Sequence, residues 1–145
     1  MYINKAKKIV LKIGSSNLVD KQGKLKEKWL KSLVTDIEKL RRKGKEFVIV
    51  SSGEIALVKN HLKVKKKRLK IEMSQALASV GQIYLTNIYK EIFKKKKINI
   101  GQILISPDDT EQRRRAINIK RTFENLFKLK AIPVVNENDS TATSE

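Results

Sequence analysis

Four short segments rich in isoleucine, valine and leucine, separated by segments with helical periodicity, constrain the fold of this chain most. The short segments lie at positions 9–13, 47–50, 100–105 and 132–135, and their length is typical of buried strands. Between them, apolar residues recur every three or four positions, which is the spacing of one helix face. The three stripes are Leu25, Trp29, Leu33, Ile37 and Leu40; Met73, Ala76, Leu77 and Val80, continued by Leu85, Ile88 and Ile92; and Ala116, Ile119, Phe123, Leu126 and Phe127.

This alternation predicts an α/β fold. Strands that are apolar along their whole length are buried on both faces, as happens when helices cover both sides of a parallel sheet. A length of 145 residues fits one domain. We therefore expect a single parallel sheet with helices on both faces, and we expect Trp29, which lies on the first helical stripe, to be in the core.

Composition excludes several classes of protein. No stretch approaches the roughly 20 apolar residues that span a membrane, and Lys5, Lys7 and Lys8 interrupt any apolar leader. Cysteine is absent and His61 is the only histidine, so neither thiolates nor a histidine cluster can hold a metal ion. We expect a cytoplasmic protein with no metal site of its own, and an exposed basic loop at positions 61–70.

The formal charge of +18 raises the possibility of an anionic partner. Most of the 33 basic residues are lysines spread over the expected helix faces and turns. Proteins that read bases favour arginine for bidentate contacts, and they use aromatic side chains for stacking. Only 6% of this chain is aromatic. A basic, non-catalytic nucleic-acid-binding protein is therefore kept as an alternative, whose binding would weaken steeply with salt.

Polar turns follow three of the four expected strands. They are Gly14-Ser15-Ser16, Ser51-Ser52-Gly53, and the four residues Asn136 to Asp139. The carboxyl ends of parallel strands share one edge of a sheet, where ligands of open α/β sheets bind. Glycine lets the backbone approach a ligand, and successive N–H groups near a helix start attract anions. We expect a site for phosphate or carboxylate at this edge.

Lys12 interrupts the first apolar segment. It could simply face solvent at an edge of the sheet, with its aliphatic stem packed along apolar surface. It could instead extend its ammonium over the strand end and neutralise phosphate charge. Phosphoryl transfer depends mainly on positioning and electrostatic stabilisation, so a lysine beside glycine turns suits it.

Several segments of the sequence resemble motifs of the amino acid kinase family, and those around Gly81 and Asn136 are most similar to its glutamate-phosphorylating members. The resemblance covers essentially the whole chain. It implies a three-layer αβα sandwich with a mainly parallel sheet, of which residues 1–145 would be the N-terminal, glutamate-binding part. The nucleotide-binding half, and any RNA-binding-like C-terminal domain, would lie outside these residues. The matching segments are residues 12–16, 49–53, 78–82, 101–104 and 133–143.

The resemblance also implies an activity. ATP, with Mg²⁺, would phosphorylate the side-chain carboxylate of L-glutamate to give L-glutamyl 5-phosphate, the first step of proline biosynthesis. Proline would be a feedback inhibitor, glutamyl phosphate reductase a functional partner, and the full-length enzyme a homo-oligomer. These 145 residues alone would be inactive. Another family member acting on a different acidic substrate, an acetylglutamate or aspartate kinase, is the alternative.

Residue roles follow from the same resemblance. Lys12 matches the catalytic lysine that stabilises the transferring phosphoryl group, and Gly14 and Ser15 match the ATP phosphate turn. Asp139 would engage the ammonium of glutamate, and Glu137 would help to shape the pocket. The glutamate-binding residues would be Ser52, Gly53, Asn136, Asn138 and Asp139.

Two positions depart from the family pattern. Glu54 stands where a small residue is usual, and a carboxylate beside a phosphate turn would repel an anion unless it points away. Val58 stands where glycine is usual, so the helix that contains it is expected to pack differently.

Overall fold

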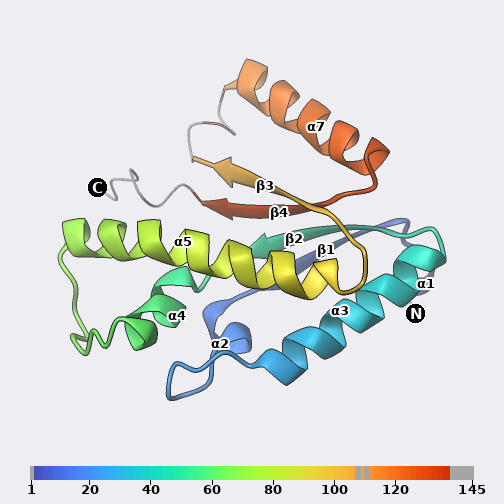
Figure 1. The fold of residues 1–145 in the computed structure, drawn as a ribbon. Helices are drawn as coiled ribbons and strands as arrows, with labels where there is room; N and C mark the ends of the chain where they lie inside the picture. Colours follow the sequence, from blue (N-terminus) through green and yellow to red (C-terminus); the bar gives the residue numbers. More distant parts are fainter. Residues whose placement is uncertain (1, 107–108, 110–111, 138–145) are drawn as a thin grey trace.

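The computed structural model describes residues 2–106, 109 and 112–137 (Figure 1). Four strands form one fully parallel sheet in the order β1-β2-β4-β3, so the predicted α/β class and strand direction are confirmed. The strands are β1 (Lys8–Ile13), β2 (Glu46–Ser51), β3 (Ile100–Ile105) and β4 (Ile132–Glu137). The described helices are α1 (Tyr2–Lys5), α2 (Ser15–Leu18), α3 (Glu27–Arg42), α4 (Glu54–His61), α5 (Ile71–Lys94) and α7 (Arg113–Lys128).

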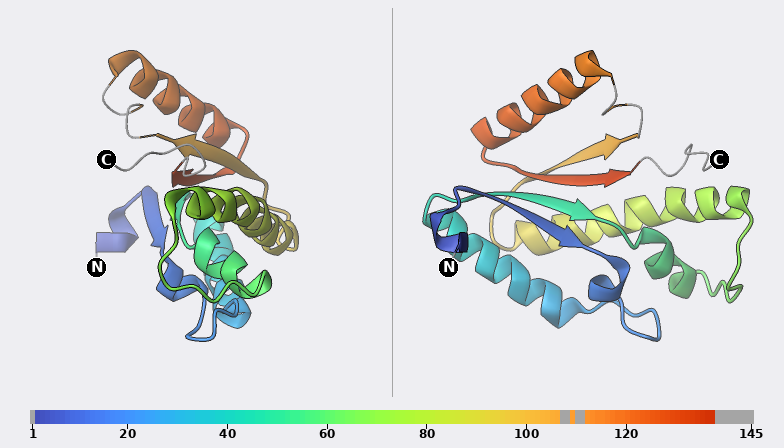
Figure 2. Two further views of the ribbon diagram at one scale, coloured as in Figure 1. Left: turned by 90° about the vertical axis from the view of Figure 1, so that its left-hand side faces the viewer. Right: turned by 180° about the vertical axis from the view of Figure 1, so that it is seen from behind.

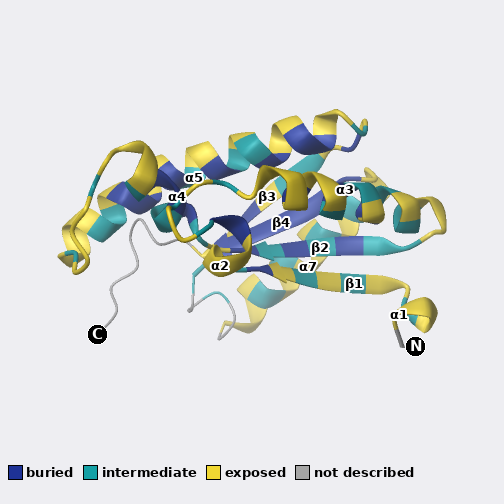
Figure 3. Ribbon diagram, turned by 90° about the horizontal axis from the view of Figure 1, so that it is seen from below, coloured by how far each residue is buried: buried dark blue, intermediate teal, exposed yellow. Residues whose placement is uncertain are grey.

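The two faces of the sheet are covered unequally. Of the described helices, α3 and α5, with the shorter α2 and α4, lie on one face, whereas α7 lies on the other (Figures 1 and 2). The hydrophobic core lies between the sheet and the α3–α5 layer, and includes Phe47, Ile49 and Val34. On the α7 side, Val10 of β1 is 66% exposed. We expected helices to cover both faces of the sheet, but the α7 side is covered only in part. Strand β1 is largely exposed there (Figure 3).

Two of the predicted helical stripes pack differently from expectation. Trp29 is 39% exposed, so the prediction that it is a core residue is wrong. It lies in the first turn of α3, and the fully buried positions of that helix are Leu30, Val34 and Ile37. The stripe on α7 faces the sheet as expected, but it has no fully buried residue because a single helix on this face leaves its flanks open.

Four helices end in the same type of turn. After α3, the N–H of Lys45 donates to the carbonyl of Leu40, while the N–H of Gly44 donates to that of Arg41. This paired pattern places the residue just beyond the helix in the left-handed region, where glycine is favoured. Gly44 takes that place after α3, but lysines take it after the other three helices, and their φ values are 56° at Lys63, 57° at Lys97 and 55° at Lys130.

None of the helices in the described segments combines the length and apolar character that a membrane crossing needs.

Candidate functional site

The two glycine–serine turns lie against each other at the carboxyl edge of the sheet. The N–H of Ser52 donates to the carbonyl oxygen of Ile13, at 3.0 Å. Gly53 has a φ of +102°, and a Cβ on it would lie only 2.8 Å from Cα of Ser15. Only glycine fits this backbone conformation and this approach. The sequence-based expectation that these turns meet at one edge is confirmed.

The polar groups of these turns are open to ligand. Ser15 and Ser52 are both exposed, and Gly14 is half-buried. Gly14 has an ordinary φ of −88°, and an added Cβ would have no neighbour closer than 3.9 Å. Neither backbone conformation nor packing therefore requires glycine at position 14. The absence of a side chain there leaves the backbone accessible from outside.

Lys12 is exposed and lies one residue before the end of β1. It shares the exposed face of that strand with Lys8 and Val10. This face points toward α7, because Lys8 Nζ lies 5.2 Å from the ring centroid of Phe127 on that helix. Within the described part of the chain, the side chain of Lys12 has no hydrogen bond or ion pair. Its ammonium group is available to an anion near the strand end.

Asn136 is the penultimate residue of β4, next to this edge, and is buried, with 8% of its surface exposed. Its Nδ2 donates to Glu54 Oε2 at 3.3 Å, and its Oδ1 accepts from the N–H of Glu137 at 2.8 Å. Glu54 is also buried, at 3% exposure. Its carboxylate therefore points into the protein rather than toward the phosphate-type turn, which answers the concern about anion repulsion.

Helix α5 packs against the backbone of Glu54 and against the end of β4. A Cβ on Gly81 would lie 2.5 Å from the carbonyl oxygen of Glu54, so α4 and α5 touch through their backbones. The next residue of the same helix also contributes, since Gln82 Nε2 donates to the carbonyl oxygen of Glu137 at 3.2 Å. The end of β4 is thus fixed both through Asn136 and through Gln82.

A buried hydrogen bond lies beneath the second turn. Ser51 Oγ and Tyr89 Oη are 2.7 Å apart, and Tyr89 is 1% exposed. Burial raises the pKa of Tyr89 to about 12; the Ser51 bond opposes that shift and the nearby Glu54 adds to it. At neutral pH the phenol is therefore a fixed neutral partner that anchors β2 to α5.

The structure thus brings together Lys12, Gly14, Ser15, Ser52 and Gly53, and places Asn136 beside them as a buried residue. Asn138 and Asp139, the other expected ligands of glutamate, lie outside the described residues. Sequence reasoning missed the supporting contacts made by Ser51, Tyr89 and Gln82, and gave Glu54 no positive role. The signals were weak: a serine directly after an apolar strand, and a glycine–glutamine pair inside a helix. Val58, the other departure from the family pattern, is fully buried under α5.

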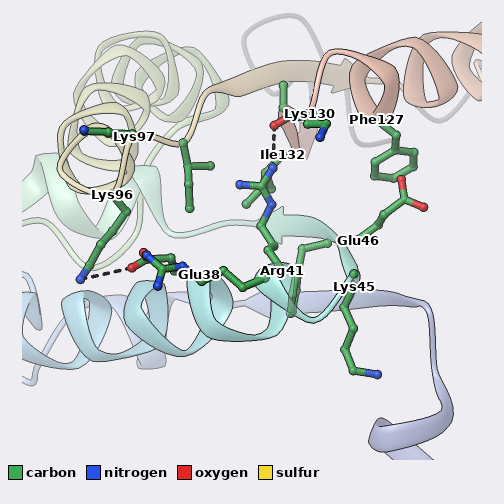
Figure 4. A pocket seen from close by; sticks show the side chains of 14 residues that line it. Glu38, Arg41, Lys45, Glu46, Lys96, Lys97, Phe127, Lys130 and Ile132 are labelled. Carbon is green, nitrogen blue, oxygen red and sulfur yellow. Dashed lines mark hydrogen bonds and ion pairs between the residues drawn. The ribbon is translucent and has the colours of Figure 1, made fainter.

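A cavity of about 450 Å³ opens at the opposite, amino-terminal edge of the sheet (Figure 4). Four of the six described cations that line it, including Arg42 with Glu38, already have partners for their side chains. Arg41 Nη2 donates to the carbonyl oxygen of Lys130 at 2.6 Å, burial lowers the pKa of Arg41, and Lys96 pairs with Glu38 at 3.4 Å. Lys45 donates to three carbonyls around α1. These contacts satisfy the carbonyl-rich ends of helices, so we place the candidate site at the carboxyl edge.

The described residues contain no group of three or more histidine, aspartate or glutamate side chains that could hold a metal ion. At the carboxyl edge the described carboxyl groups are Glu54, which is bonded to Asn136, the exposed Glu137, and Asp109 after β3, which is bonded to the N–H of Ser106 and to Arg115. Mg²⁺ commonly binds through substrate phosphates with only one or two carboxylates, so such an ion would enter with a nucleotide.

A family model and several curated proteins match this chain, and the matches agree with one another. Residues 7–145 match the model of the amino acid kinase family. The chain is 56% identical over 145 residues to a glutamate 5-kinase of Pelagibacter ubique (strain HTCC1062), an alignment that covers all of this chain and 39% of that protein. It is 50% identical over 139 residues to a glutamate 5-kinase of Brucella abortus (strain S19), covering 96% of this chain and 37% of that protein. The chain spans about two fifths of the length of these curated relatives.

Proposed function

Because the chain belongs to the amino acid kinase family, we propose that it forms the glutamate-binding part of an enzyme that phosphorylates L-glutamate on its side-chain carboxylate. In this reaction an oxygen of that carboxylate attacks the γ-phosphorus of ATP. The bond from the γ-phosphorus to the β–γ bridging oxygen breaks, and ADP leaves. The products are L-glutamyl 5-phosphate and ADP.

The observation that carries the proposal is the contact between the two glycine–serine turns beside the unpaired Lys12. The transferring phosphoryl group spreads negative charge over its oxygens, and it is stabilised by fixed donors and cations. Lys12 provides the cation, while the turn at Gly14 and Ser15 offers backbone groups for the phosphates. This arrangement is suited to phosphoryl transfer and lacks any histidine or cysteine nucleophile among its residues.

In this proposal glutamate, the phosphoryl acceptor, binds at the turn that contains Ser52 and Gly53 and at the end of β4. Ser52 and Gly53 form the wall next to the phosphate turn, and Asn136 supports the segment that continues to Asn138 and Asp139. In this proposal Asp139 binds the ammonium of glutamate, because a carboxylate suits that end of the substrate and Lys12 suits the other. The names of the relatives support glutamate as the acceptor.

The wider proposal concerns the setting of the reaction. ATP would arrive with Mg²⁺ on its phosphates, and residues 1–145 would be the N-terminal part of an amino acid kinase domain whose nucleotide-binding half comes from the rest of the enzyme. The product is a labile acyl phosphate, so an enzyme that reduces it, glutamyl phosphate reductase, would act next. A cytoplasmic location, a homo-oligomeric enzyme and inhibition by proline complete the proposal, and all three rest on the family resemblance.

The test is substrate competition in a full-length chain that contains residues 1–145. Product formed from ATP and glutamate is trapped with hydroxylamine as the hydroxamate, and N-acetylglutamate and aspartate are compared as acceptors. We expect glutamate to be preferred by at least about tenfold in kcat/KM, because a site built to hydrogen-bond one substrate rejects an acceptor that leaves its polar groups unpaired. A preference for either of the other acids would replace glutamate as the substrate, and retention of nucleic acid without turnover would refute the kinase proposal.

A further inference from the structure

Glu54 occupies an unusual position for an acidic residue. It is the first residue of α4, directly after Gly53 of the candidate site, yet only 3% of its surface is exposed. Charged side chains are rarely buried without a partner. Its partner is Asn136, which lies 82 residues further along the chain.

The contact links the two halves of the expected acceptor site. The backbone of Glu54 continues from Ser52 and Gly53, while Asn136 is the penultimate residue of β4. With Nδ2 on Glu54, the Asn136 amide is oriented so that its Oδ1 accepts the N–H of Glu137. Had the amide turned over, Nδ2 would face an N–H group and Oδ1 would face a carboxylate. The Glu54 contact therefore selects one orientation of the amide.

Glu54 is itself held in place. Gly81 lies against its backbone, so α4 cannot move closer to α5. The position at the first turn of α4 suits an acidic side chain, since a helix N-terminus attracts negative charge. The carboxylate is thus a rigid support for Asn136; it is buried against that amide, whereas Ser15 and Ser52 of the site are exposed.

We infer that Glu54 is a positioning residue for the acceptor site, acting through the side-chain amide of Asn136. Its carboxylate oxygen fixes the amide, the amide fixes the backbone at Glu137, and this sets the geometry at the end of β4, where Asn136 is itself an expected glutamate ligand. The inference rests on the proposed function, since it names a determinant of glutamate affinity.

The experiment compares Glu54→Gln with Glu54→Met in a full-length chain that contains residues 1–145. Both side chains fill a similar volume, but only glutamine retains an acceptor oxygen for Asn136. We expect Glu54→Met to raise KM for glutamate about tenfold with little change in KM for ATP, because a buried amide loses its hydrogen-bond partner. Glu54→Gln should stay within about twofold of the wild type, because it keeps that bond.

A merely structural role would lower the active fraction, and hence kcat, and leave KM for glutamate unchanged in Glu54→Met; that result would overturn the inference. So would a Glu54→Gln variant as impaired as Glu54→Met. In an Asn136→Ala background, adding Glu54→Met should raise KM no further, since the two residues act in series. A wild-type enzyme that does not phosphorylate glutamate would overturn the proposed function and this inference together. If the wild type is active but Glu54→Met leaves KM for glutamate unchanged, the inference alone is overturned.

Discussion

Gly53 and Ser15 join the two turns of the candidate site, with so little space between them that a Cβ on Gly53 would be 2.8 Å from Cα of Ser15. Gly53→Ala must therefore separate the turns or abandon its φ of +102°. We expect a loss of about 2 kcal/mol in the free energy of unfolding, since strained backbone of this kind costs of the order of 1–3 kcal/mol. Urea denaturation measures it.

Gly14→Ala is the matched control on the other turn. Its φ of −88° and open surroundings accept a Cβ, so stability should change by less than about 0.5 kcal/mol. Activity with ATP should nevertheless fall, because the methyl group occupies the space where phosphate would approach the backbone. A Gly14→Ala protein with normal KM for ATP would remove this turn from the phosphate site.

Gly81 and Glu54 form the second close backbone contact. Alanine at position 81 would place its Cβ 2.5 Å from a carbonyl oxygen that cannot rotate away, so α5 must move from α4. We expect the free energy of unfolding to fall by about 1–2 kcal/mol, although alanine has the better helix propensity. Ser79→Ala, at an exposed position of the same helix, is the control and should be neutral or slightly stabilising. A stabilised Gly81→Ala protein would contradict the packing.

Tyr89 predicts a specific alkaline dependence of stability. Its pKa is raised to about 12 in the folded protein, against about 10 in the unfolded chain. Between these values the unfolded state binds fewer protons, so stability is complete below pH 10 and is lost as the pH rises toward 12. The loss should be on the order of 2 kcal/mol.

The control for this effect is Tyr89→Phe, which removes the ionisable group. The variant should be less stable at neutral pH by about 1–2 kcal/mol, because Ser51 loses its buried partner. Its stability should then fall less than that of the wild type from pH 10 upward. Parallel pH profiles of the two proteins would show that Tyr89 does not titrate as described.

The lysine at position 97 offers a stabilising change. Because its φ is 57°, replacement by glycine relieves left-handed strain, and we expect a net gain of roughly 0.5–1 kcal/mol. Lys95→Gly, two residues earlier at a φ of −60°, relieves nothing and should lower stability. Thermal or urea unfolding of the two variants should shift in opposite directions, and shifts of the same sign would contradict the assignment of strain.

The sequence predicts the strands and the edge at which their polar turns meet, because both depend on local patterns. Runs of branched apolar residues define the four strands, and glycine–serine turns follow two of them. The order of the strands in the sheet cannot be predicted in this way. Strand β4 lies between β2 and β3, and no periodicity in the sequence encodes which strands are neighbours. The exposure of Trp29 has a similar cause, since two adjacent helix faces both carry apolar residues and tertiary packing selects between them.

The support of the site was beyond sequence reasoning because it consists of contacts between distant positions. Glu54 and Asn136 pair across 82 residues, and Ser51 and Tyr89 across 38. Read alone, Glu54 was a departure from a family pattern and Ser51 was part of a turn. Only the folded chain shows that both belong to the buried layer beneath the ligand-binding edge.

Lys12 and Lys8 provide the most direct test of the central claim, that the carboxyl edge of the sheet carries out phosphoryl transfer. Both lysines lie on the exposed face of β1, four positions apart, and only Lys12 is at the candidate site. In a full-length chain that contains residues 1–145, Lys12→Ala should lower kcat for glutamate phosphorylation by about 100-fold or more with little change in KM, because its charge acts on the transition state. Lys8→Ala should leave kcat unchanged. An unchanged kcat in Lys12→Ala, or equal losses in both variants, would contradict the account.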